Sequence, residues 1–244
     1  MSVAPTAIFD LDGTLVDTAP DLAASLDHCL AAAGLPLAGL ARIRPHAGHG
    51  AQAMLRLGYD WAGAPLWGDE LAGQTARFLA FYEANIAVSS KLYPGATDAL
   101  DRLASAGFRL AVCTNKTERL ARLLLAGLGL DARFSAICGA DTFPARKPDP
   151  VHILGTLAQA GGEASRAVMI GDSRTDLDAA GAVAMPSVLM DFGDAALDAD
   201  DRAKAALILP SFDALDASSL LCLATGRRPI DAHHRPPLLA AAAE

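Results

Sequence analysis

The sequence has few cysteines, and none of them is spaced for a metal or redox site. Its four cysteines, Cys29, Cys113, Cys138 and Cys222, lie far apart, with no CxxC pair among them. Zinc ribbons and thioredoxin-like redox centres need such close pairs, so both classes are excluded. We therefore expect free thiols in a reducing compartment.

The chain also lacks an excess of positive charge and a long apolar run. Lysine and arginine number 20 against 28 acidic residues, which gives a formal charge of −8. Without a basic face, binding to nucleic acid or to anionic lipid is not expected. No stretch reaches membrane-spanning length, and Asp10 interrupts the N-terminal apolar run before a signal peptide could form. We expect a cytoplasmic protein without membrane or nucleic-acid partners, and either a monomer or a homodimer.

Short apolar runs that are typical of strands alternate with helical patterns through most of the chain. The expected strands are 6–11, 108–113, 134–139, 167–170 and 187–190. Helices are expected between them, with boundary signals at Thr97, Gly107, Thr117, Gly127 and Thr175. Because the strands are apolar throughout, the pattern predicts an α/β fold, a Rossmann-like parallel sheet with helices on both faces.

Residues 19–88 break this alternation. They contain helical stretches and a Gly/Pro/His-rich loop at 42–50, with no good strand among them. The pattern predicts a helical cap inserted after the first strand of an α/β core, which is formed by residues 1–18 and 89–225. Residues 226–244 combine prolines, basic residues and an alanine run, and we expect them to form a flexible tail.

Polar residues follow the expected strands at the edge where parallel sheets bind ligands. Four clusters occur there: Asp10 with Asp12, Thr114 with Asn115, Lys147, and Asp172 and Ser173 with Asp176. Carboxylates gathered at one point repel each other unless a cation neutralises them. Oxygen ligands from Asp10, from Asp12 or its backbone carbonyl, and from Asp172 suit Mg²⁺, which often shares its coordination with a phosphate.

The same residues are suited to phosphoryl transfer. Thr114 and Lys147 offer a hydroxyl donor and a point positive charge, which together match a phosphoryl group. Asp10 would then attack phosphorus as the nucleophile. Asp12 would protonate the departing oxygen and later take a proton from the attacking water.

Four motifs carry a resemblance to a known superfamily. The segments "DLDGTLVDT", "CTN", "RKPDP" and "IGDSRTD" occur in this order, and the chain resembles the haloacid dehalogenase superfamily of phosphohydrolases over residues 5–225. The resemblance implies an aspartyl-phosphate on Asp10 and general acid–base catalysis by Asp12. The remaining roles that it implies are metal binding by Asp172, phosphate binding by Gly13, Thr114, Asn115 and Lys147, and support of the metal site by Ser173 and Asp176.

The helical insertion holds no Asp or Glu between His28 and Tyr59, although the chain as a whole is acidic. Within this window the candidates to bind a second negative group of the substrate are Arg44, His46, Gly48, His49 and Gly50. The segments "RPHAGHGAQAML", "NKTERLARLLLAGLGL" and "CGADTFPARKPDP" resemble those of phosphoglycolate phosphatases. This resemblance implies a small phosphorylated metabolite, 2-phosphoglycolate, as the substrate.

Other functions stay open at this point. Within the superfamily, a sugar-phosphate phosphatase or mutase, a pyrophosphatase or a nucleotidase would use the same residues. A phospho-accepting signalling receiver also uses a strand-end aspartate, a metal, a threonine and a lysine. A receiver has no use for a general acid such as Asp12 or for a helical lid.

Overall fold

The central sheet is built from short, largely buried strands. The computed structural model describes residues 3–192 and 197–226. Within these ranges, six parallel strands form the sheet in the order β5-β4-β1-β6-β7-β8. Their bounds are β1 Thr6–Phe9, β4 Arg109–Cys113, β5 Ala136–Cys138, β6 Ala167–Gly171, β7 Ser187–Met190 and β8 Leu207–Leu209.

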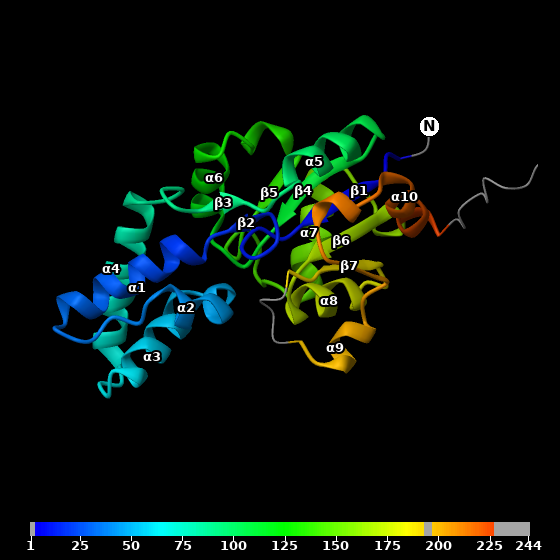
Figure 1. Ribbon diagram of the computed structural model, residues 1–244. Helices are drawn as coiled ribbons and strands as arrows, with labels where there is room; N and C mark the ends of the chain where they lie inside the picture. Colours follow the sequence, from blue (N-terminus) through cyan, green and yellow to red (C-terminus); the bar gives the residue numbers. More distant parts are fainter. Residues whose placement is uncertain (1–2, 193–196, 227–244) are drawn as a thin grey trace, which may run out of the picture.

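Helices cover both faces of this sheet (Figure 1), which confirms the predicted α/β fold. Side chains alternate along each strand, so Ala7 and Phe9 of β1 pack on one face and Ile8 on the other. The first face is covered by α5, α6 and α10, and the second by α7 and α8. The helix bounds are α5 Ala96–Ser105, α6 Glu118–Gly127, α7 Pro150–Ala160, α8 Arg174–Gly181, α9 Ala199–Ala203 and α10 Ala217–Thr225.

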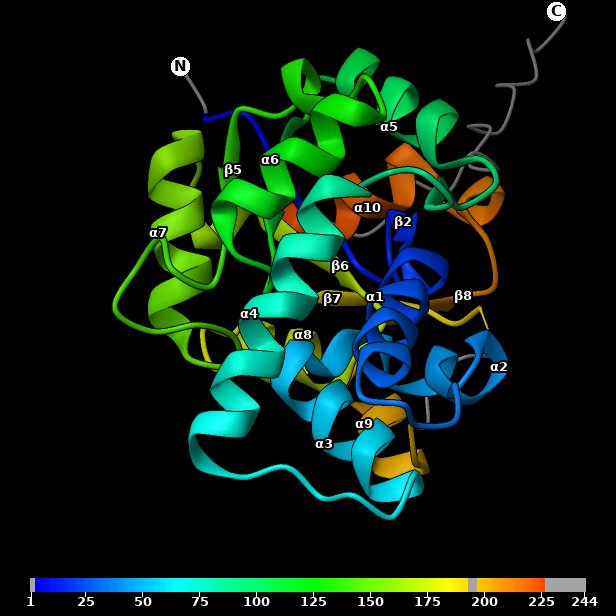
Figure 2. The same ribbon diagram turned by 90° about the vertical axis from the view of Figure 1, so that its left-hand side faces the viewer.

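The other helices gather beside the carboxyl edge of the sheet and have a hydrophobic cluster of their own. Leu26, Met54 and Phe78 are buried in this cluster, which Leu120 of α6 joins from the sheet side. Figure 2 views the molecule from the side of these helices. Their bounds are α1 Ala19–Ala32, α2 Leu40–Ile43, α3 Ala51–Trp61 and α4 Gly68–Ala84, with the 3₁₀ helix η1 Arg44–His49 before α3.

Several predicted boundaries were wrong. Residues 42–50, expected as a loop, are mostly helical. Pro45 is compatible with this because it stands in the first turn of η1, where a backbone N–H would have no partner within the helix. Thr97 does not cap α5, which begins at Ala96 after Gly95, a residue with a φ of +78°. Residues 227–244, nearly all of the expected tail, lie outside the described residues.

Two short strands at the ends of the helical insertion were not predicted. β2 (Val16–Asp17) and β3 (Lys91–Leu92) pair in antiparallel fashion. Beside them the buried Asp21 carboxylate accepts hydrogen bonds from the Ser89 N–H at 2.9 Å, the Ser90 N–H at 2.8 Å and the Ser90 hydroxyl at 2.6 Å. The chain therefore enters and leaves the helices through two adjacent segments that are bonded together.

Two expectations from composition bear on the rest of the chain. The four cysteines carry free thiols, as predicted. Among the described helices, none combines the length and the apolar character that crossing a bilayer requires.

Candidate active site

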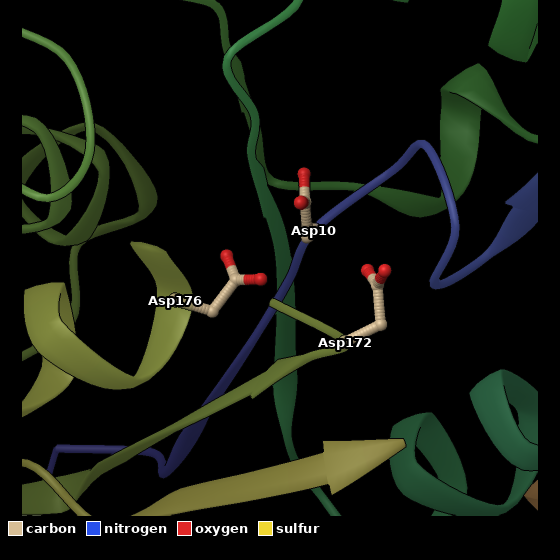
Figure 3. A group of neighbouring side chains, drawn as sticks. All are labelled: Asp10, Asp172 and Asp176. Carbon is tan, nitrogen blue, oxygen red and sulfur yellow. The ribbon is translucent and has the colours of Figure 1, made fainter. Parts of the chain in front are cut away.

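Asp10 and Asp172 follow neighbouring strands at the same edge of the sheet. β1 pairs with β6 in parallel, with Phe9 opposite Ile170, and the Asp10 N–H donates to the Ile170 carbonyl at 2.9 Å. Asp176 comes from the first turn of α8, just after β6. One carboxylate oxygen from each of the three acids lies within 4.8 Å of the others (Figure 3). The fold therefore gathers three carboxylates at one point.

Lys147 lies between two of these acids. Its Nζ is 3.0 Å from Asp10 Oδ1 and 2.6 Å from Asp176 Oδ1, and its side chain is fully buried. Burial raises the pKa of Asp10 to about 7, although the charge of Lys147 acts in the opposite direction. Burial also acts to lower the pKa of Lys147, but Asp10 and Asp176 outweigh it and raise that pKa overall. The lysine thus stays charged and offsets part of the negative charge.

Asp172 is held by the turn that follows β1. The Thr14 hydroxyl donates to Asp172 Oδ1 at 2.6 Å. Burial, followed by the charges of Asp176 and Asp10, raises the pKa of Asp172 well above its usual value. Gly13 has a φ of +82° in this turn, and a Cβ there would lie 2.5 Å from Asp172 Oδ2. Glycine is therefore required at position 13 both by the backbone and by the approach of the carboxylate.

This donor set fits a hard divalent cation. Within the described part of the chain, the ammonium of Lys147 offsets one of the three carboxylate charges and leaves two in a largely buried site. The donors are all carboxylate oxygens, the ligands that Mg²⁺ prefers, whereas zinc sites are richer in nitrogen and sulfur. A divalent cation bound at this point would neutralise the remaining charge.

The Asp12 carboxylate has partners other than the expected metal. Lys116 Nζ donates to Asp12 Oδ1 at 2.9 Å and to Oδ2 at 3.1 Å, and the Thr18 hydroxyl donates to Oδ1 at 2.7 Å. The group of three acids contains Asp176 and not Asp12. Since Lys116 already neutralises this carboxylate, the backbone carbonyl is the part of Asp12 that stays a candidate metal ligand.

The expected residues Asn115 and Ser173 support their neighbours. Asn115 Nδ2 donates to the Lys147 carbonyl at 3.0 Å, while Thr114 is buried directly after β4. Ser173 caps α8, and its hydroxyl donates to Asp176 Oδ2 at 2.6 Å. Asn115 thus lies beside the Lys147 loop, and the role of Thr114 and Asn115 in phosphate binding stays a prediction.

The residues expected to contact the substrate from the insertion lie on one segment, from η1 to the start of α3. They are Arg44, His46, Gly48, His49 and Gly50. The Arg44 guanidinium makes two hydrogen bonds of 3.0 Å to the carboxylate of Asp17 in β2. The His46 and His49 rings pack with centroids 5.5 Å apart, and burial together with His46 lowers the pKa of His49. Arg44 therefore connects this segment to the strand that leads from Asp12.

Two residues in contact with the site were not recognised as functional from the sequence. The Lys147 N–H donates to His152 Nδ1 at 3.1 Å. Burial and the charge of Lys147 lower the pKa of His152 to about 4, which keeps its ring neutral and able to accept this bond. Lys116, which holds Asp12, follows Asn115 directly. The available signal for His152 was position, because it stands five residues after Lys147, the motif residue that it contacts. Lys116 contacts Asp12, which is distant in the sequence, so position gave no signal for that pairing.

Gly13→Ala is expected to lower activity at least about tenfold, because the new methyl group displaces Asp172 and the left-handed backbone costs roughly 1 kcal/mol or more. Phosphate release from a phosphate monoester measures the effect on activity. Thermal unfolding measures the effect on stability.

Gly34→Ala is the matched control, because Gly34 also has a positive φ of +69° but nothing lies within 4 Å of its added Cβ. This variant should lose stability alone. Full activity in Gly13→Ala would contradict the close approach of Asp172.

Comparison with known proteins agrees with this geometry. Residues 7–190 match the family model of haloacid dehalogenase-like hydrolases. The chain is 46% identical over 189 residues to a phosphoglycolate phosphatase from Mesorhizobium japonicum, covering 78% of this chain and 83% of that protein. It is 47% identical over 191 residues to a phosphoglycolate phosphatase from Agrobacterium fabrum, covering 78% and 82% of the two chains.

A solved structure has the same fold over most of its length. The crystal structure of a predicted phosphoglycolate phosphatase from Haemophilus somnus aligns with a TM-score of 0.78 at 29% identity. The alignment covers 90% of this chain and 98% of the other.

Proposed function

The chain belongs to the haloacid dehalogenase-like hydrolase family, and we propose that it is a Mg²⁺-dependent phosphatase that hydrolyses 2-phosphoglycolate through an aspartyl-phosphate on Asp10. The observation that carries the proposal is the placement of Lys147 between Asp10 and Asp176, with Asp172 beside them. The identity to two phosphoglycolate phosphatases supports the choice of substrate.

The reaction divides into two transfers at phosphorus. An Asp10 carboxylate oxygen attacks the phosphorus, the bond to the substrate alkoxide breaks, and Asp12 protonates the departing oxygen. Asp12 then accepts a proton from water as the water oxygen attacks the same phosphorus and releases Asp10. Each step leaves Asp12 in the protonation state that the next one needs.

Lys147 and the candidate metal site would offset the negative charge of the phosphoryl group. The buried ammonium of Lys147 already contacts Asp10 and stands ready to hold a phosphoryl oxygen, and the Thr114 hydroxyl would donate to another. Bound Mg²⁺ would be held by Asp10, Asp172 and the Asp12 carbonyl, while Asp176 would keep its contact with Lys147. The metal would reduce repulsion between the nucleophile and the phosphate. Uncatalysed hydrolysis of phosphate monoesters is extremely slow, so all of these contributions are needed.

Residues 19–88 act in this proposal as a cap over the site. Their basic segment would bind the carboxylate of 2-phosphoglycolate, while the other groups engage the phosphate. The link from Arg44 to Asp17, close in sequence to Asp12, supports this placement of the segment.

The enzyme is expected to prefer 2-phosphoglycolate over a neutral sugar phosphate by about tenfold or more in kcat/KM, because only the first carries a second anion for the cap. Arg44→Met should reduce this ratio, since it removes a cation from the segment. Steady-state kinetics on both substrates measure the ratio.

Arg42→Met is the matched control, because the Arg42 guanidinium lies over the Trp61 ring at 4.7 Å. This control should keep the wild-type ratio. A wild-type preference for the neutral compound would exclude 2-phosphoglycolate as the substrate while leaving the phosphatase chemistry intact.

A further inference from the structure

Lys116 is a buried cation whose contacts join three separate parts of the chain. It follows the Thr114-Asn115 pair after β4, and only 6% of its side chain is exposed. Its Nζ donates to both carboxylate oxygens of Asp12, in the turn after β1. The same ammonium lies 4.6 Å from the centre of the Tyr82 ring, on α4. Burying a lysine this deeply is costly unless its partners fix it in place.

These contacts restrict how the Asp12 carboxylate can be oriented. Oδ1 accepts from Lys116 at 2.9 Å and from the Thr18 hydroxyl at 2.7 Å, while the bond that Oδ2 accepts from Lys116 is longer, at 3.1 Å. Bonds to both oxygens fix the plane of the group. Oδ2 keeps the greater unused acceptor capacity and is therefore the oxygen better able to exchange a proton.

Tyr82 in turn restricts Lys116. Tyr82 is 1% exposed as a residue and belongs to the hydrophobic cluster of α1–α4. A cation over the face of an aromatic ring is attracted by the electron density of the ring, more strongly where water is excluded. The position of α4 is thereby coupled to the orientation of Asp12 through a single lysine.

We propose that Lys116 is a positioning residue for proton transfer, which holds the Asp12 carboxylate with Oδ2 toward the leaving oxygen of the substrate, and that Tyr82 fixes Lys116 for this task. The inference rests on the proposed role of Asp12 as general acid. In this role Lys116 acts through Asp12 and needs no contact of its own with phosphorus or the leaving group. Its N–H donors are directed at Asp12 and the Tyr82 ring, which leaves the ammonium poorly placed to bind a substrate carboxylate.

The dependence of the rate on the leaving group tests this proposal. An alkoxide needs a proton as it departs, whereas p-nitrophenolate departs readily without one. Lys116→Met keeps the length of the side chain but removes its charge and donors. We expect kcat/KM to fall about thirtyfold or more for 2-phosphoglycolate and for the neutral ester glycerol 3-phosphate, but less than about threefold for p-nitrophenyl phosphate. Lys116→Arg, which keeps the charge and can donate to both oxygens of the Asp12 carboxylate, should restore part of the loss.

Each alternative role for Lys116 predicts a different pattern. Equal losses on all three esters would overturn the proposal in favour of a general structural or phosphate-binding role. A loss confined to 2-phosphoglycolate would overturn it in favour of carboxylate binding. If the wild-type protein hydrolyses none of the three esters, the proposed phosphatase function itself is wrong. That result differs from both patterns of loss described for the Lys116 variants.

Tyr82 provides a second test on another element. Tyr82→Leu removes the ring face and should produce the same leaving-group pattern, with a smaller loss. Tyr82→Phe is the matched variant that keeps the ring. Its ratio of kcat/KM for alkyl esters to kcat/KM for p-nitrophenyl phosphate should therefore stay at the wild-type value. Circular dichroism and thermal unfolding establish that each variant is folded. A Tyr82→Phe ratio that changes as much as that of Tyr82→Leu would exclude the ring contact as the cause.

Discussion

Asp10→Asn is expected to abolish turnover while the fold stays intact. The amide is close in size to the carboxylate, and its oxygen can still accept the Leu11 N–H, which donates to Asp10 Oδ1 at 2.7 Å. An amide is not a competent nucleophile toward phosphorus, so we expect a loss of about 10⁴-fold or more in kcat. Release of inorganic phosphate measures the loss, and thermal unfolding reports the fold.

The nucleophile can also be identified directly. Acid-quenched wild-type enzyme mixed with substrate should carry a phosphoryl group on the peptide that contains Asp10, and Asp10→Asn should not. Asp131→Asn, at an exposed acid on the 3₁₀ helix η2 (Asp131–Arg133), is the matched control and should retain wild-type turnover. Substantial turnover by Asp10→Asn would end the covalent mechanism.

Asp172→Asn is expected to abolish activity and to make the metal-free protein more stable at neutral pH. The pKa of Asp172 in the folded chain lies well above its usual value, because of burial and then the charges of Asp176 and Asp10. When folding raises the pKa of an acid, the protein becomes less stable as the pH rises from the pKa of that acid in the unfolded chain to its pKa in the folded chain. Asparagine avoids this loss and can still accept the bond from Thr14.

The stability gain should appear as a rise of at least about 2–4 °C in Tm, the shift that about 1 kcal/mol produces in a chain of this size. Thermal unfolding in a chelator measures it. Added Mg²⁺ should then raise the Tm of the wild-type protein but not that of the variant, since a ligand stabilises only the state that binds it. Activity should fall by at least about a thousandfold.

Asp176→Asn provides the contrast. Asp176 makes the 2.6 Å contact with Lys147 and caps α8 through Ser173, so its loss removes partners from a buried cation and from a helix start. This variant should be less stable than the wild-type protein under the same conditions. If Asp172→Asn were also destabilised in chelator, the bonds that the Asp172 carboxylate accepts would outweigh its repulsion by the other two acids.

The meeting of Asp10 and Asp172 was predictable because it depends on topology, whereas Lys147, in the loop between β5 and α7, was expected there from its motif. Apolar runs that each end in a polar residue specify parallel strands, and parallel strands place their carboxyl ends at one edge. The partners of the Asp12 carboxylate were not predictable in this way. The sequence suggested a strand as far as residue 11, but β1 ends at Phe9, and Asp12 lies in a turn with an isolated bridge to Val16. The alternation of side chains along a strand does not apply there.

Lys116 and the short strands were missed for a related reason. A lysine after a loop motif is normally solvated, and the burial of Lys116 depends on Asp12 and Tyr82, which only the tertiary fold brings to it. β2 and β3 have two residues each, too few for any periodic pattern to show. These features exist because of contacts between distant segments, and single-sequence patterns carry little information about such contacts.

The antiparallel pair of β2 and β3, with the Asp21 bonds beside it, has a consequence for how such a protein diversifies. A segment whose two ends leave the parent fold side by side behaves as one long surface loop, whatever its size. Recombination can lengthen it or exchange it for another without altering the register of the sheet. The chemistry of the strand ends would then be inherited unchanged, while the range of esters admitted to it evolves separately.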